Sequence, residues 1–256
     1  MRLPTLEVGL HSQTRRVTGD PSHAEEARIR VAYARRGDGW RYDWGAPAYV
    51  FTMHDLERRL LAALRRSGLW PLGAMRVLDV GCGTGHWLRR LVDWGAQPQH
   101  ATGIDLLLER LRSGAPLSPR EVGLSCASGR ALPFRSASFD LVLQFMAFTS
   151  ILDADFRRRV ADEMVRVLAP EGAILWYDFC VPNPRNPDLR PVRAAEVRAL
   201  FPDCLVELHR VTLATPVTRL VAPFSRALCG LLNLFPPLRT HYLGVIRRRP
   251  WRRSIE

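Results

Sequence analysis

Three glycines in the stretch VLDVGCGTGHWL, residues 77–88, have a spacing that suggests chemistry. Gly81, Gly83 and Gly85 follow a short apolar run, which is typical of a turn where a ligand lies against bare backbone. The dinucleotide-binding fingerprint is G-x-G-x-x-G, and its pyrophosphate binds free N–H groups at a helix N-terminus. Here the third glycine comes one position earlier and residue 86 is His. The spacing therefore favours a ligand other than a dinucleotide.

Two acidic residues accompany this turn, one at the end of each of two successive predicted strands. Asp79 lies just before the glycines, where a carboxylate repels phosphate and attracts an ammonium group. Asp105 follows Gly85 by 20 residues, and an acid at that place accepts hydrogen bonds from ribose hydroxyls. Together the residues predict a ligand with an amino acid, a ribose and an adenine but no phosphates. That description fits S-adenosylmethionine.

Each of these residues also has an interpretation without a ligand. The glycines alone are consistent with a tight turn, and Asp105 alone is consistent with a helix N-cap. Cys82 is interpreted first as a small, partly buried residue and only second as a reactive thiol. His86 opens a predicted helix, where it either touches a substrate or lies at the surface.

The elements that must position these residues alternate along the chain. Apolar runs predict strands at 76–80, 101–105, 122–126, 139–144, 172–179, 204–212 and 240–247. Helices are expected over 20–36, 47–67, 85–94, 155–168 and 191–200. This order predicts an α/β fold with a Rossmann-like, doubly wound sheet and helices on both faces. Ligands of such sheets bind at the carboxyl ends of the strands.

Four stretches in this order resemble the class I S-adenosylmethionine-dependent methyltransferases, in particular their small-molecule branch with quinone-biosynthesis-like enzymes. The stretches are VLDVGCGTG (77–85), TGID (102–105), LPFRSASFDLV (132–142) and an AxEMxRVLxPxGxI-type run (161–174). The resemblance covers residues 70–180 well. It implies a seven-stranded sheet whose last strand is antiparallel and lies beside the sixth. It also implies methyl transfer to a small-molecule acceptor.

The resemblance implies a set of cofactor-binding residues, carried over by position. They are Asp79, Gly81, Cys82, Gly83, Gly85, Asp105, Leu106, Ser128, Gly129, Arg130 and Gln144. The first motif holds the methionine portion, Asp105 the ribose, and Leu106 packs on the adenine. Gln144 lies where relatives line the pocket near the methyl group.

The chain departs from the family pattern at Ser128. Many relatives have an aspartate there that bonds the adenine amino group. The Ser128 hydroxyl, or the backbone at Gly129 and Arg130, would have to take over this contact. For Arg130 a solvated loop position is the alternative to an adenine contact.

Methyl transfer asks little of the protein, because the sulfonium charge already activates the methyl group. Alignment of nucleophile and methyl in a dry pocket supplies much of the catalysis. A hydroxyl acceptor benefits from a general base, whereas a basic amine does not. Asp178 and His241, beside Tyr177 and Tyr242, are the candidates for catalysis at the carboxyl edge, and a structural role is the alternative for each. PNPRNP (182–187) is expected to form a rigid loop on the substrate side.

Composition bounds the function without deciding it. The net charge is +12, yet all 37 basic residues are arginine and they are scattered along the chain. An arginine-rich codon usage therefore explains the charge better than a basic surface that binds nucleic acid does. Five cysteines with no CxxC argue against a disulfide framework and a metal site, and indicate a reducing, cytoplasmic compartment. No apolar run is long enough to span a membrane, and the N-terminus lacks the apolar core of a secretory signal.

The expected organisation has three parts. Residues 1–68 form an N-terminal helical extension or cap, 69–247 a methyltransferase domain, and 248–256 a basic tail. Substrate choice is expected outside the sheet, in the aromatic stretch RYDWGAPAYVF (41–51) and in the segment 217–235. That segment is a helical insert between the last two strands. It is interpreted as a packed connection, as a lid over an apolar acceptor, or as a dimer or membrane-surface contact.

Other functions remain open at the level of sequence. A methyltransferase that acts on nucleic acid or protein and a non-catalytic binder of S-adenosylmethionine share the same cofactor motifs. A nicotinamide-dependent oxidoreductase shares the broad fold, although the glycine spacing and His86 argue against it. The sequence leaves the oligomeric state, the acceptor and the methylated atom undetermined.

Overall fold

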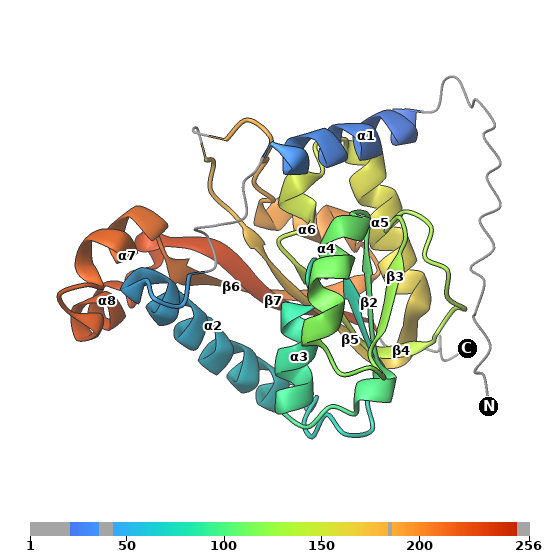
Figure 1. Cartoon of the computed structure of the whole chain (residues 1–256), viewed down its shortest axis with the longest axis horizontal. Helices are drawn as coiled ribbons and strands as arrows, with labels where there is room; N and C mark the ends of the chain where they lie inside the picture. Colours follow the sequence, from blue (N-terminus) through green and yellow to red (C-terminus); the bar gives the residue numbers. More distant parts are fainter. Residues whose placement is uncertain (1–20, 36–42, 184–185, 250–256) are drawn as a thin grey trace, which may run out of the picture.

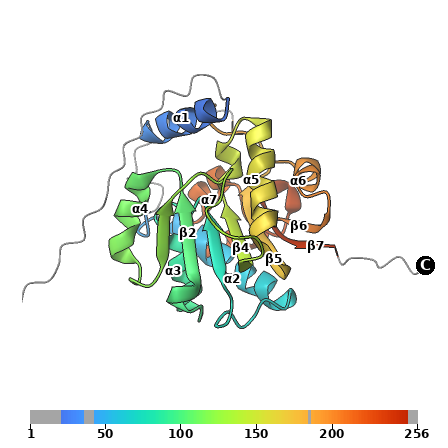
Figure 2. The same cartoon turned by 90° about the vertical axis from the view of Figure 1, so that its right-hand side faces the viewer.

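A central mixed sheet of seven strands organises the computed structural model, which describes residues 21–35, 43–183 and 186–249 (Figures 1 and 2). The strand order is β3-β2-β1-β4-β5-β7-β6. The strands are β1 (Val77–Val80), β2 (Ala101–Asp105), β3 (Gly123–Cys126), β4 (Phe139–Phe145), β5 (Leu168–Phe179), β6 (Cys204–Leu213) and β7 (Arg239–Arg248). Strand β7 lies between β5 and β6 and runs antiparallel to both, while the remaining strand pairs are parallel. The predicted fold, including the antiparallel last strand beside the sixth, is confirmed.

Helices cover both faces of this sheet. They are α1 (Pro21–Ala34), α2 (Pro47–Arg66), α3 (His86–Asp93), α4 (Leu108–Gly114), α5 (Ala154–Val167), α6 (Ala194–Leu200), α7 (Thr215–Val221) and α8 (Arg226–Leu232). One apolar cluster joins a sheet face to residues of α1, α5 and α6. A second cluster joins the opposite face to α2, α3 and α4. Alternation within β4 produces this division, because Val142 faces the first cluster while Leu141 and Leu143 face the second.

Local signals explain where several helices begin. Pro47 occupies the first turn of α2, where its missing N–H costs no hydrogen bond. Asp153 caps α5 by accepting from the Phe156 N–H at 2.7 Å. The expected helix at 191–200 begins later, at Ala194, because Arg193 is extended.

The expected insert 217–235 contains two short helices, α7 and α8. They lie between β6 and β7 and pack against the N-terminal half of α2. Figure 1 shows them at one end of the molecule, beside α2. Pro223 lies between them, and proline does not continue a helix.

Helix α1 lies across the carboxyl edge of the sheet, above α4 and α5 in both views (Figures 1 and 2). Glu25 accepts from the Leu152 N–H at 2.6 Å, and Arg28 donates to the Ser150 carbonyl at 2.5 Å. The Tyr33 hydroxyl lies 3.0 Å from Ser150 Oγ. These contacts hold α1 on the loop that follows β4.

Some expectations concern parts of the chain that lie outside the described residues. They include the first 20 residues, Tyr42 and most of the basic tail, and the loop 182–187 is described only in part. Within the described ranges, no helix is long and apolar enough to cross a membrane.

Candidate functional site

The glycine turn after β1 is held by its own backbone amides. The N–H groups of Gly81 and Cys82 both donate to the Ile104 carbonyl, at 2.8 and 2.9 Å, and the Gly85 N–H donates to the Cys82 carbonyl at 2.9 Å. The Gly83 N–H donates to Asp105 Oδ2 at 2.8 Å. Four amides that could otherwise cradle a phosphate are therefore already used.

Close packing explains two of the glycines. Gly81 has φ +80°, and a Cβ there would meet Ala147 Cβ at 2.8 Å. Gly83 has φ +57°, and a Cβ there would lie 2.6 Å from Arg110 Nη2. A side chain at either position would be strained and would push against the loop after β4 or against α4.

Asp79 is a buried carboxyl group with no hydrogen-bond partner in the part of the chain that the structure describes. It is 1% exposed, and neither of its carboxylate oxygens has a hydrogen-bond partner among the described residues. Burial, and then the neighbouring charge of Asp105, raise its pKa from 3.8 to about 8. An unpaired buried carboxylate is costly, so this position favours a ligand that brings a cation.

Asp105, at the end of β2, is positioned by two backbone amides. Its Oδ2 accepts from Gly83 and its Oδ1 accepts from the Leu107 N–H, both at 2.8 Å. Each carboxylate oxygen retains further lone pairs, so this group can still accept hydroxyl groups from a ligand. It joins the glycine turn to the end of β2 and supplies an acceptor there.

The residues expected at the adenine end lie beyond β3. Ser128, Gly129 and Arg130 are half-buried, and Ser128 Oγ is a buried atom with no partner among the described residues. Arg130 Nε donates to Glu26 of α1 at 3.1 Å. Leu106 packs partly buried against the first apolar cluster. Arg130 is therefore tied to α1, and Ser128 keeps a free hydroxyl.

Gln144 and Asp178 form a buried polar pair at the ends of β4 and β5. Gln144 Nε2 donates to Asp178 Oδ2 at 2.7 Å, while Gln144 Oε1 has no partner in the described part of the chain. Asp178 also accepts from the N–H groups of Thr149, at 3.1 Å, and Phe179, at 2.8 Å. Burial raises the pKa of Asp178 to about 6 against these hydrogen bonds. One acceptor of this pair, Gln144 Oε1, is left for a ligand.

Comparison with known proteins gives the site its family. Residues 77–172 match the family described as a methyltransferase domain. Over 188 residues the chain is 30% identical to malonyl-[acyl-carrier protein] O-methyltransferase of Methylovorus sp., covering 70% of this chain and 57% of that protein. Over 123 residues it is 32% identical to demethylmenaquinone methyltransferase of Roseiflexus castenholzii, covering 47% and 48%. The chain carries a class I S-adenosylmethionine-dependent methyltransferase domain.

A solved structure shares this fold. N-methyltransferase NodS from Bradyrhizobium japonicum, in complex with S-adenosyl-L-homocysteine, superimposes with a TM-score of 0.62 at 16% identity, covering 88% of this chain and 99% of that one. At this identity the likeness concerns the fold. The chain spans about half the length of the curated relatives it matches.

His241, the second catalytic candidate of the methyltransferase domain, lies in an aromatic stack at the start of β7. Its ring stacks on Tyr177 at 4.7 Å between centroids and lies 4.0 Å from the ring of Phe179. Nδ1 is 3.0 Å from Thr240 Oγ1. Burial lowers the pKa of His241 to about 3, so the imidazole is neutral near pH 7.

Pattern reasoning missed two residues near the glycine turn, Arg110, which lies against it, and Tyr33 of α1, which contacts Arg110. Arg110 of α4 lies against Gly83 and over the ring of Tyr33, 5.2 Å from its centroid. Arg110 could have been found, because it comes five residues after Asp105 in the first helical turn beyond that acid. Tyr33 carried no local signal, since only the docking of α1 brings it there.

Cys82 fits its interpretation as a small buried residue, whereas His86 does not lie at the surface: it is half-buried, and its Nε2 is a buried atom with no partner among the described residues. Cys82 is buried, and burial followed by the charges of Asp79 and Asp105 raises its thiol pKa far above the ordinary value. Burial and then Arg89 lower the pKa of His86 to about 4. A protonated thiol is a poor nucleophile, so Cys82 serves as a small wall of the turn.

Proposed function

We propose that the protein transfers the methyl group of S-adenosylmethionine to an oxygen atom of a small-molecule acceptor by in-line displacement. The observation that carries the proposal is Asp79, whose two buried oxygens have no partner among the described residues and lie beside a turn whose amides are used. A cofactor with an ammonium group and no phosphate matches both features.

The described residues fit the parts of this cofactor. Asp79 would hold the ammonium group and Asp105 the ribose hydroxyls, because both offer carboxylate oxygens at the end of a strand. Ser128 Oγ would accept from the adenine amino group. Gln144 Oε1, which has no partner within the described ranges, would line the pocket where the methyl group lies. The bound cofactor supplies an electrophilic methyl on a sulfonium.

Alignment, rather than a dedicated base, is the catalytic device that we propose. His241 has a pKa of about 3, and such an imidazole accepts protons poorly near pH 7. The two oxygens of Asp178 already accept three N–H groups, which orient Gln144 and the loop at Thr149. We therefore assign Asp178 a positioning role. Without a dedicated base, the acceptor would react in an ionised form or in one that ionises readily.

Oxygen is proposed as the methylated atom on the names of two relatives. Malonyl-[acyl-carrier protein] O-methyltransferase of Methylovorus sp. and O-methyltransferase resE of Aspergillus sclerotiorum are both named for transfer to oxygen. Dimethylglycine N-methyltransferase of Parasynechococcus marenigrum, at 34% identity over 126 residues, keeps nitrogen as the second candidate. The test must therefore separate the two atoms.

A turnover assay with methyl-labelled S-adenosylmethionine tests the function. The full chain is incubated with quinols, phenols, carboxylic acids with their thioesters, and amines, with Asp105→Ala as the inactive control. We expect label in ether or ester products. Label only in amines would move the function to nitrogen. Nucleic acid and protein are assayed in the same way. Cofactor binding without turnover of any of these acceptors would indicate a non-catalytic cofactor-binding protein.

Ser128→Ala is expected to weaken S-adenosylmethionine binding about two- to twelvefold, because one neutral hydrogen bond contributes about 0.5–1.5 kcal/mol. Ser128→Asp should restore or tighten binding, since a carboxylate accepts more strongly than a hydroxyl. Calorimetry with both variants measures this. Ser125→Ala, at an exposed position on β3, is the matched control. Unchanged affinity in both Ser128 variants would assign the adenine contact to backbone groups.

A further inference from the structure

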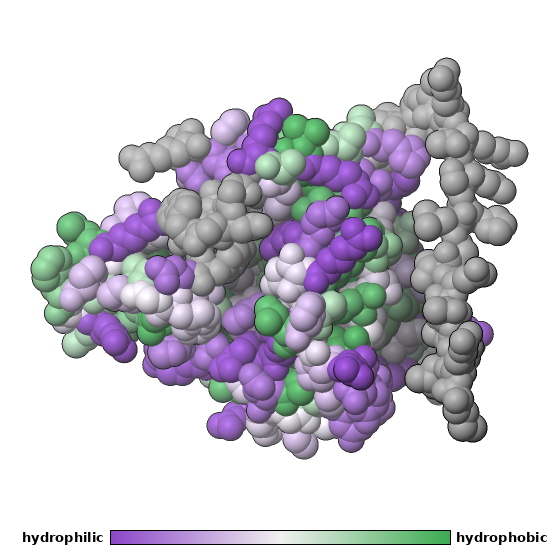
Figure 3. All heavy atoms as spheres, viewed as in Figure 1, coloured by the Kyte–Doolittle hydropathy of each residue, from purple (hydrophilic) through white to green (hydrophobic). Residues whose placement is uncertain are grey.

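The outer surface of α7 and α8 exposes large apolar side chains. Eleven large hydrophobic side chains are exposed among the described residues, and six of them lie between residues 220 and 235. The six, which we call the hairpin face, are Leu220, Phe224, Leu228, Leu231, Leu234 and Phe235. Figure 3 shows hydrophobic residues gathered at this end of the molecule. Phe224, in the turn between the helices, is 86% exposed, so this surface is presented to a partner rather than tucked against the fold.

The inner side of the same segment is anchored, which fixes the direction of the hairpin face. Cys229 and Ala222 are buried in a small cluster with Ala48 and Phe51, which lie in α2. This apolar contact helps to orient α7 and α8, so that the buried side of each helix faces the protein and the other side faces solvent.

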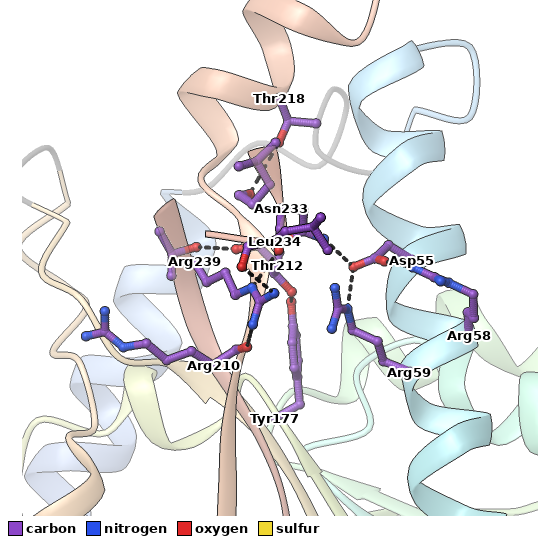
Figure 4. A network of polar contacts seen from close by, with 12 residues as sticks. Asp55, Arg58, Arg59, Tyr177, Arg210, Thr212, Thr218, Asn233, Leu234 and Arg239 are labelled. Carbon is purple, nitrogen blue, oxygen red and sulfur yellow. Dashed lines mark hydrogen bonds and ion pairs between the residues drawn. The ribbon is translucent and has the colours of Figure 1, made fainter. Parts of the chain in front are cut away.

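Polar contacts reinforce that anchor (Figure 4). Asn233 Nδ2 donates to Asp55 Oδ2 of α2 at 2.8 Å, and Asp55 also holds Arg58 and Arg59. Arg239 donates through Nε to the Asn233 carbonyl at 2.7 Å, which satisfies a carbonyl at the end of α8. Turning the hairpin face inward would break these buried contacts, so its exposure is a stable property of the fold.

Charge decides which partner suits this surface. Residues 214–238 contain no aspartate or glutamate, and their charged side chains, Arg219 and Arg226, are both exposed. An anionic bilayer offers hydrocarbon to the apolar side chains and phosphate groups to the guanidinium groups. A second copy of the same face would bring four arginines together without an acid from either segment, which disfavours a two-fold pair.

We infer that the hairpin face docks on the surface of an anionic lipid bilayer. Seven residues in each helix suit lying in the interface and not crossing it. Helix α7 follows the carboxyl end of β6, which lies at the same edge of the sheet as the carboxyl ends of β1, β4 and β5. Docking would therefore leave the carboxyl edge of the sheet uncovered by the hairpin face, since β6 is the edge strand and β1 lies four strand positions from it. The inference does not depend on which molecule accepts the methyl group.

Vesicle cosedimentation with the full chain tests the inference. Vesicles of phosphatidylcholine alone are compared with vesicles that also contain phosphatidylglycerol, and we expect binding to the anionic set that weakens as salt rises. Phe224→Ser combined with Leu231→Ser should weaken binding about tenfold or more, because two large apolar side chains no longer enter the interface. Arg219→Gln combined with Arg226→Gln should weaken it about thirtyfold, at about 1 kcal/mol per basic residue.

Matched controls keep the outcome readable. Leu205→Ser, which is 51% exposed on β6, and Arg66→Gln, exposed at the end of α2, should leave vesicle binding unchanged. Affinity for S-adenosylhomocysteine should be equal in all variants, which shows that each is folded. Absence of vesicle binding, or equal binding by the hairpin variants, overturns the inference. So does a concentration-dependent dimer that these variants disperse without any vesicle binding, since the face would then join two copies.

Discussion

Asp79→Asn should weaken binding of S-adenosylmethionine about 100-fold or more and, at the same time, stabilise the protein without ligand at neutral pH. The loss follows because a buried charge pair with the ammonium group is replaced by a neutral contact. The gain follows because Asp79 is buried with no partner for either oxygen in the described part of the chain. Calorimetry and thermal unfolding measure the two effects separately.

The pH dependence of unfolding gives this prediction its sign. The pKa of Asp79 is about 8 in the folded chain against 3.8 for an ordinary aspartate. As the pH rises, the unfolded state therefore releases this proton at a lower pH than the folded state does. Between pH 4 and pH 8 the folded state then loses about 1.4 kcal/mol of stability per pH unit through this group, or about 4 kcal/mol by pH 7. Asp79→Asn removes that slope, and its advantage should disappear below pH 4.

Asp93→Asn, at an exposed carboxylate that ends α3, is the control for both measurements. It should change neither cofactor affinity nor the slope between pH 4 and pH 8. Equal slopes in the native chain and Asp79→Asn would show that Asp79 is ionised in the folded protein. Unchanged cofactor affinity in Asp79→Asn would place the ammonium group elsewhere.

The second large effect is expected at Asp105. Asp105→Ala should weaken binding of both S-adenosylmethionine and S-adenosylhomocysteine about 100-fold, because hydrogen bonds to a charged group contribute about 1.5–3 kcal/mol each. The variant also frees the Gly83 N–H, which now donates to Asp105 at 2.8 Å. Part of the loss will therefore come from a looser glycine turn.

Asp105→Asn separates the two contributions. One amide oxygen can still accept from Gly83, so the turn should stay ordered while the contact to two ribose hydroxyls is weakened. Intermediate affinity is expected by calorimetry, with the native unfolding temperature nearly kept. Tight binding of NAD by the native chain, with no binding of S-adenosylmethionine, would contradict the assignment of the site.

The secondary-structure elements, the glycine turn and the two acids of the site could be predicted from local sequence pattern. Strand β1 is a short apolar run before glycines, and all of its residues are buried, as a central parallel strand requires. The acids at the ends of β1 and β2 could be assigned to neighbouring strand ends, because parallel strands end at one edge. Cap and turn residues act within a few positions of themselves, which is why they are readable without a structure.

Local sequence pattern predicted less about the parts of the structure where several segments of the chain meet. The helix α4 follows Asp105 closely, and no expected range delimited it. The insert 217–235 was expected to be helical with Pro223 in its middle, but the bounds of its two helices, α7 and α8, were not predicted. Arg130 was weighed as a solvated residue or an adenine contact, and the fold pairs it with Glu26.

The sequence by itself determined the order of strands and helices, the glycine turn and the acids beside it, because those depend on neighbours a few residues away. Only the tertiary structure decided that Asp79 finds no partner among the described residues while the turn's amides are used. It also decided that Tyr33 reaches Arg110, and that Asn233 meets Asp55 so that six apolar side chains face outward. Burial and pairing of this kind depend on segments that are tens to hundreds of residues apart along the chain, and no local period or motif encodes them.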